Sequence, residues 1–280
     1  MPVQENGAQR VPRRPFRIVA MLMLSAAFAV GTLAVDPAPA LAAAKKVVIV
    51  VGPTGSQTAS FIRDAKGLAS VARSYGADVR EIYSPNATWT RVKSHAQGAN
   101  ILIYLGHGNG YPSPYGSFQR YTKDGFGLNK AASSGHYNVK YWGEYYIDRY
   151  IQMAPNAVVI LARLCYASGN SEWGAANPTK STAMKRIDNY GAGFLRAGAK
   201  AVFAEGVTSA AYIIKNLYTS SRNMREIFFA SPSRTMSYRF HFSSARTSGV
   251  TGSGDPYRPS RYYRSVVGWL ATTANQWRAS

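Results

Sequence analysis

The feature that most constrains the fold is a regular alternation of short apolar runs with segments of helical periodicity. Five runs have the apolar or alternating character of β-strands: residues 45–52, 77–83, 100–106, 156–164 and 200–206. Three stretches between or after them place apolar residues at helical spacing: 56–76, 88–97 and 207–218. Strands that alternate with helices require crossover connections, which favour parallel pairing and helices on both sheet faces. The sequence therefore predicts a three-layer α/β/α sandwich with a mainly parallel central sheet.

The first 42 residues have the pattern of an export signal. Four arginines lead into the apolar run 18–35, and small residues follow at the spacing of a cleavage site after Ala42, with Ala40 as an alternative. The alternative is an uncleaved anchor, because 18 apolar residues are just long enough to span a bilayer. We predict cleavage, a single domain over residues 43–280, and a secreted or cell-wall-associated protein without a stable membrane span. The stretch "RRPFR" also resembles a twin-arginine signal.

The segment that follows the predicted signal is strongly basic. It holds 29 basic and 11 acidic side chains, a formal net charge of +18. A chain of this charge associates with polyanions, and for an exported protein an anionic cell-wall polymer is a possible partner. The basic residues are scattered, without a basic stripe of interleaved aromatics, so the sequence predicts no specific nucleic-acid partner. The charge can equally be a colloidal property of the surface.

Cysteine usage leaves two interpretations open. Cys165 is the only cysteine, so an intramolecular disulfide is excluded. A single thiol is either a small buried apolar group or a reactive nucleophile. No spacing of histidine, cysteine and carboxylate residues predicts a metal site, and no motif predicts a cofactor. The turn "GPTGSQT" (52–58) lacks the lysine of a phosphate loop, and we interpret it as a turn that lines the same sheet edge as His107.

A histidine and the cysteine follow two successive apolar runs. His107 comes one residue after the run 100–105, and Cys165 comes directly after the run 156–164. If these strands are neighbours, both side chains emerge at the same edge of the sheet, where open parallel sheets bind ligands. An imidazole beside a thiol is the arrangement that activates a cysteine nucleophile. Gly106 and Gly108 are expected to give a substrate close access, and the amide of Gly108 to stabilise an oxyanion.

The pieces "ILIYLGHG" (101–108) and "VVILARLCYASG" (158–169) resemble the caspase-like cysteine peptidases, a group that includes caspases, legumain and gingipains. The resemblance covers about residues 45–218. It implies a caspase-like fold and an endopeptidase in which Cys165 attacks a peptide bond and His107 protonates the leaving amine. Leu164 departs from the pattern, since many members carry a small or acidic residue before the cysteine.

A specificity residue is not evident from the motifs. Three carboxylates are candidates for binding a basic side chain of the substrate: Glu172, Asp188 and Glu205. Two segments, 109–137 and 166–185, are predicted as long loops that begin at the same sheet edge, and long loops in a compact domain are usually functional. A final strand is predicted within 262–270. The function predicted is that of an exported cysteine endopeptidase; the alternative is a non-catalytic, basic surface protein that binds wall polymer.

Overall fold

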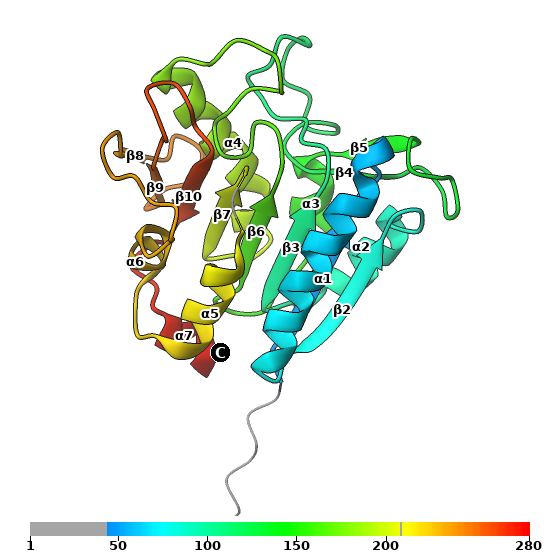
Figure 1. The fold of residues 1–280 in the computed structure, drawn as a ribbon, viewed down its shortest axis with the longest axis horizontal. Helices are drawn as coiled ribbons and strands as arrows, with labels where there is room; N and C mark the ends of the chain where they lie inside the picture. Colours follow the sequence, from blue (N-terminus) through cyan, green and yellow to red (C-terminus); the bar gives the residue numbers. More distant parts are fainter. Residues whose placement is uncertain (1–43, 208) are drawn as a thin grey trace, which may run out of the picture. The chain divides into compact units, whose positions relative to one another are not determined.

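The computed structural model describes residues 44–207 and 209–280, and the predicted export signal lies outside these described residues. Its central feature is an eight-stranded sheet with strand order β2-β1-β3-β6-β7-β10-β9-β8 (Figure 1). Its strands are β1 (Lys46–Val51), β2 (Asp78–Tyr83), β3 (Ile101–Leu105), β6 (Val158–Ala162), β7 (Ala201–Glu205), β8 (Phe240–Ser243), β9 (Thr251–Gly254) and β10 (Arg264–Gly268). A separate two-stranded sheet pairs β4 (Phe126–Asn129) with β5 (Val139–Trp142).

The five strands from β2 to β7 are parallel, and the last three are antiparallel to their neighbours. All five strand runs of the sequence analysis are therefore confirmed, and the predicted final strand is β10. The mainly parallel sheet is confirmed as well. The antiparallel extension was not predicted, because the segment after residue 230 has little apolar periodicity apart from β10.

Helices lie between several of the strands in the sequence, and one more follows the last strand. They are α1 (Thr58–Ser74), α2 (Trp89–Ala96), α3 (Glu144–Tyr150), α4 (Lys180–Arg196), α5 (Ala211–Thr219), α6 (Met224–Phe229) and α7 (Ala274–Ala279), with a short 3₁₀ turn over Gly55–Gln57. The segment predicted as a loop over 166–185 ends inside α4. The N-cap of this helix is Thr179, whose side chain accepts a hydrogen bond from the Thr182 amide.

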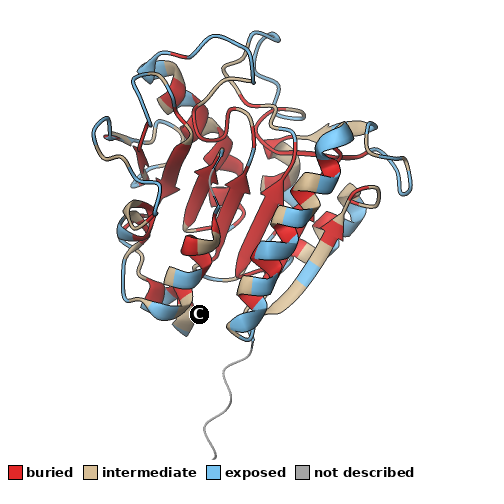
Figure 2. Ribbon diagram, viewed as in Figure 1, coloured by how far each residue is buried: buried red, intermediate tan, exposed pale blue. Residues whose placement is uncertain are grey.

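Each face of the sheet is covered by its own apolar core. Side chains alternate along a strand, so in β3 Leu102 and Tyr104 pack with α2, α3 and α4, whereas Ile101 and Ile103 pack with α1, α5, α6 and α7. The parallel strands β1, β3, β6 and β7 are buried along almost their whole length (Figure 2). This burial explains why their sequences are nearly continuous apolar runs. Among the described residues, no helix is both long and apolar enough to cross a membrane.

Candidate active site

The strands that carry His107 and Cys165 are direct neighbours. β3 and β6 pair in parallel, with Leu105 opposite Ala162. His107 lies two residues after Leu105 and Cys165 lies three residues after Ala162, so both leave the sheet at its carboxyl edge. Both residues line one cleft of about 410 Å³. The spatial relation on which the sequence prediction depends is thus present in the structure: thiol and imidazole share a cleft, and neither is sealed in the interior.

Three other segments complete this cleft. The turn between β1 and α1 contributes residues 54–57, which confirms that the "GPTGSQT" segment reaches the edge of His107. The loop between β4 and β5 contributes His136 and Tyr137. The turn between β6 and the cysteine contributes Arg163. The loop and the turn are joined by a 2.7 Å hydrogen bond from the Gly55 amide to the His136 carbonyl. The cleft is therefore built on the sheet edge and closed by residues far apart in the sequence.

Unusual backbone geometry presents Cys165. Arg163 and Tyr166 on either side have positive φ values of 60° and 68°, a conformation that costs energy in non-glycine residues. The Arg163 amide donates to the Glu205 carbonyl at 2.8 Å, so β7 holds this turn from one side. The turn lifts the thiol out of the strand, and Cys165 is only partly buried.

The two glycines beside His107 are required by close contacts within the protein. A Cβ on Gly108 would lie 1.9 Å from the Cys165 carbonyl oxygen, and one on Gly106 would lie 2.4 Å from the Tyr104 hydroxyl. The absence of a side chain at Gly108 allows its backbone to lie against that of Cys165. Access for a substrate stays a prediction. Within the described residues, no hydrogen bond from the Gly108 or Cys165 amide to another group is found.

A buried tyrosine fixes the backbone of the histidine. The Tyr104 hydroxyl accepts from the Gly127 amide at 2.8 Å and lies 3.0 Å from the His107 carbonyl oxygen. Burial raises the pKa of Tyr104 far above its ordinary value, so the hydroxyl stays protonated and able to donate. The His107 side chain packs against Gly127: a Cβ added to Gly127 would lie 3.4 Å from the Cβ of His107. β4 therefore supports the imidazole from behind.

Burial shifts the pKa values of the thiol and the imidazole in the directions that favour their neutral forms. Burial raises the pKa of the Cys165 thiol, the Glu172 charge raises it further, and a hydrogen bond from the Trp173 amide lowers it. His107 is exposed at the cleft mouth. Partial burial against the cleft walls nevertheless lowers its pKa, and this effect outweighs the Glu172 charge, which raises the pKa. A neutral pair needs a proton transfer from sulfur to nitrogen before the sulfur can act as a nucleophile.

The structure separates the three predicted specificity carboxylates. Glu172 is partly buried near the thiol, accepting hydrogen bonds from Tyr166 at 2.7 Å and Tyr115 at 2.8 Å. Asp188 is buried in α4, where it accepts from the Ala245 amide at 2.7 Å. Glu205 is fully buried and paired with Arg264 at 3.0 Å. Of the three, Glu172 is the one whose charge acts on both Cys165 and His107, although it does not line the cleft itself.

Sequence reasoning missed three cleft residues. His136 and Tyr137 come from the long loop 109–137, which the sequence predicts to be functional, but nothing local distinguishes these two residues within it. Arg163 could have been predicted from the sequence. It directly follows an apolar strand and lies two residues before the cysteine, so it must lie at the same sheet edge. Of the described residues that line the cleft, it is the one with a permanently charged side chain, and it is paired with Asp64 at 2.7 Å. This pairing neutralises much of its charge toward the cleft.

Within the described residues, no group of three or more histidine, cysteine or carboxylate side chains is arranged to hold a metal ion. No family model matches the chain, and no curated protein sequence matches it. Among solved structures, the chain is similar to the Arg-specific cysteine proteinase gingipain R, with a TM-score of 0.35 and 11% identical residues. The match covers 82% of this chain and 61% of that one. A likeness at this level does not establish a family, so the function is argued from the site.

Proposed function

We propose that the chain is an exported cysteine endopeptidase built on a caspase-like, three-layer α/β/α sandwich over residues 43–280. One observation carries the proposal: Cys165 and His107 follow adjacent parallel strands and line the same cleft. A buried packing cysteine would have no reason to stand on a turn with two positive φ values at the end of a strand. Such strain typically accumulates at functional sites.

The chemistry begins with transfer of the Cys165 proton to His107. The thiolate sulfur then attacks the carbonyl carbon of the peptide bond, and the carbonyl oxygen gains the negative charge. In this proposal the amides of Gly108 and Cys165 donate to the oxyanion, a contribution typically worth about 2.7–4 kcal/mol per donor. His107 returns its proton to the leaving amine as the carbon–nitrogen bond breaks, leaving a thioester. Water, deprotonated by His107, hydrolyses the thioester and restores the thiol.

Substrate binding supports the first proton transfer. A peptide in the cleft displaces water and places its carbonyl next to the amide donors, so the thiolate forms as the oxyanion site is filled. The Trp173 amide donates to the sulfur and stabilises the developing thiolate. The Trp173 side chain is 96% exposed. An indole so placed beside the nucleophile offers an apolar contact to a bound peptide.

We assign recognition of a basic substrate side chain to Glu172. Its carboxylate is oriented by two tyrosine hydroxyls and lies close enough to Cys165 to act on the thiol. Asp188 and Glu205 serve internal contacts that a substrate would have to break. The Asp64 partner of Arg163 reduces the repulsion that a basic side chain would otherwise meet in the cleft.

The proposal is tested with the mature chain and a panel of peptides that differ in one side chain, together with a thiol-reactive peptidyl probe. We expect hydrolysis and labelling by the wild type, neither by Cys165→Ala, and hydrolysis reduced by orders of magnitude in His107→Ala. The matched control is His95→Ala, a histidine on α2 outside the cleft, which should remain fully active. Absence of labelling and of hydrolysis in the wild type would refute the peptidase. The non-catalytic, wall-polymer-binding protein would then be the remaining interpretation.

A further inference from the structure

A second pocket, of about 530 Å³, lies at the sheet edge opposite the candidate active site. It is formed where β10 ends, and Gly268 at that end pairs with Ala201, the first residue of β7. The candidate active site lies beyond the other end of β7, where Glu205 pairs with Ala162. The second pocket is therefore separated from Cys165 by the length of a strand, and side chains can be changed there without touching the cleft.

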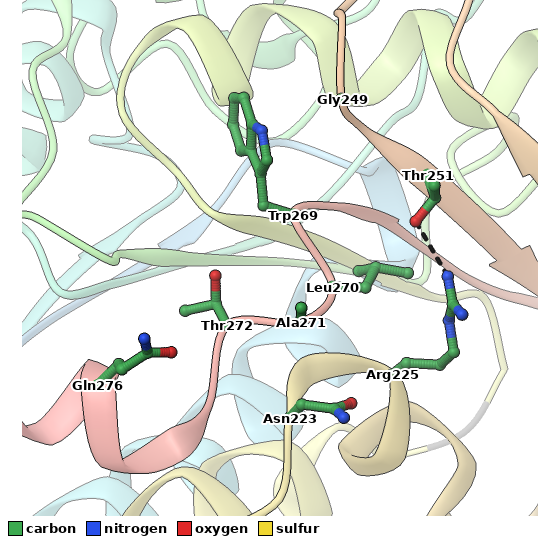
Figure 3. A pocket seen from close by; sticks show the side chains of 9 residues that line it. All are labelled: Asn223, Arg225, Gly249, Thr251, Trp269, Leu270, Ala271, Thr272 and Gln276. Carbon is green, nitrogen blue, oxygen red and sulfur yellow. Dashed lines mark hydrogen bonds between the residues drawn. The ribbon is translucent and has the colours of Figure 1, made fainter.

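The lining of this pocket combines apolar surface with several hydrogen-bond donors. Gly249, Leu270 and Ala271 form part of the lining (Figure 3). The side chains that carry a hydrogen-bond donor are those of Asn223, Arg225, Thr251, Trp269, Thr272 and Gln276. The amide oxygens of Asn223 and Gln276 already accept from the backbone amides of Glu226 (2.9 Å) and Thr273 (2.8 Å). These capping bonds determine which way each amide group is turned. What the two side chains can offer a ligand is therefore their NH₂ groups.

The guanidinium of Arg225 is held in place but not satisfied. Its Nη2 donates to the Thr251 hydroxyl at 3.0 Å, as Figure 3 also shows. Its Nε is buried and has no hydrogen-bond partner among the described residues. A buried donor without a partner is costly and is therefore expected to serve a ligand or a water molecule. Among the described residues, no carboxylate lines the pocket, and the neighbouring Glu226 accepts from the Asn223 backbone amide at 2.9 Å.

Trp269 gives the pocket an aromatic wall. The Lys200 ammonium lies 4.7 Å from the centre of its ring and adds positive charge beside the pocket. Gly249, at φ +72°, faces the indole: a Cβ there would lie 3.6 Å from Nε1. The glycine thus leaves the indole N–H accessible. An aromatic wall surrounded by N–H donors and positive charge is the environment that binds a ring with acceptor oxygens and a negative charge.

We propose that this pocket binds a sugar or polyol unit that carries a carboxylate or phosphate group. The anionic group is bound by Arg225 with the amide of Asn223, and the ring packs against Trp269 with its hydroxyls near Thr272 and Gln276. Such units are building blocks of anionic surface polymers. The pocket would give the basic chain a specific attachment point in place of diffuse charge attraction.

The test follows the indole N–H signal of Trp269 by NMR, assigned with Trp269→Phe, while four compounds are titrated into the full mature chain. Glucuronate carries a carboxylate on a sugar ring and glucose 6-phosphate carries a phosphate, whereas glucose lacks the charge and acetate lacks the ring. We expect saturable shifts with one or both charged sugars, at least tenfold weaker binding of glucose and acetate, and at least a tenfold loss in Arg225→Gln. Which charged sugar binds more tightly distinguishes a carboxylate polymer from a phosphate polymer.

The charge-matched control is Arg149→Gln, an exposed arginine on α3 that does not line this pocket; its binding should equal that of the wild type. If Arg225→Gln does not fold, Thr272→Val serves instead and should weaken binding without unfolding the chain. No saturable shift up to about 10 mM, or equal losses in Arg225→Gln and Arg149→Gln, would overturn the proposal. Peptide hydrolysis should be unchanged in all these variants, so this result is separate from that of the peptidase test.

Discussion

The region of the candidate dyad and the antiparallel part of the sheet treat buried ionisable groups differently. In the antiparallel part, Arg264 is buried between Glu205 and Asp255, at 3.0 and 2.6 Å. Near the candidate dyad, Asp124 is fully buried in the loop between β3 and β4. Its Oδ1 accepts from the Tyr111 amide at 3.0 Å, whereas its Oδ2 has no hydrogen-bond partner among the described residues. The first arrangement pairs buried charges with each other; in the second, a buried carboxyl has no ion-pair partner among the described residues and is satisfied only in part.

Strand direction explains where each part places its chemistry. Parallel strands all end at one edge, so residues that follow β3 and β6 meet without any further device. β10 runs the other way, and the residues after it form the second pocket at the opposite edge. One sheet thereby presents two separate sites. The comparison predicts that each part can be perturbed with little effect on the other.

The largest effect is expected from Arg264→Ala. The substitution removes the buried cation that pairs with Glu205 and Asp255, and it should lower the free energy of unfolding by about 3–5 kcal/mol. Urea denaturation measures it. The matched control is Arg73→Ala, which removes an exposed ion pair with Glu81 and should cost no more than about 1 kcal/mol. Similar losses in both variants would contradict the contrast drawn above.

Asp124→Asn should act in the opposite direction. Burial raises the pKa of Asp124 to about 8, whereas the unfolded chain loses this proton near 3.8. Between these pH values unfolding releases a proton, so the free energy of unfolding falls as the pH rises from about 4 to 8. The asparagine variant should lose this contribution and be more stable than the wild type above pH 8. Denaturation at a series of pH values tests it, with the exposed Asp78→Asn as control; unchanged pH dependence in Asp124→Asn would refute the assignment.

Gly108→Ala should uncouple the histidine from the cysteine. The added Cβ would collide with the Cys165 carbonyl oxygen, and because the obstacle is backbone, the strands must shift. We expect a loss of about 1–3 kcal/mol in the free energy of unfolding, together with loss of peptide hydrolysis. The control is Gly67→Ala on α1, where an added Cβ meets nothing within 4 Å. Its free energy of unfolding should be unchanged or higher. Full activity in Gly108→Ala would show that the contact is unimportant.

The smallest effect is expected for Glu172→Gln, and it concerns the pKa of the Cys165 thiol. The Glu172 charge raises the pKa of Cys165, so its removal should lower that pKa without changing the fold. The rate of alkylation by iodoacetamide as a function of pH reports this directly, because the chain contains one cysteine. Hydrolysis of peptides with a basic side chain should fall in the same variant. The control is Glu226→Gln on α6, which should leave the thiol pKa unchanged. If the thiol pKa also stays constant in Glu172→Gln, Glu172 does not belong to the site.

Several features could be predicted from the sequence because they depend on local pattern. The five parallel strands are long apolar runs, and the helices between them keep their apolar residues on one face. α4 was missed although Ala183, Ile187 and Tyr190 have helical spacing, because the polar residues before Lys180 obscured its start. The strands β4, β8 and β9 have four residues each and are stabilised by pairing with distant segments, which no local pattern reveals.

By itself, the sequence determined the parallel strands, the basic charge, and the positions of one histidine and one cysteine after successive strands. Only the tertiary structure decided that β3 and β6 are neighbours, and that Glu172 lies near the thiol while Asp188 and Glu205 are engaged elsewhere. The physical reason is that periodicity records whether a side chain faces a core. Which charges meet depends on contacts between residues far apart in the chain, and those exist only once the sheet has formed.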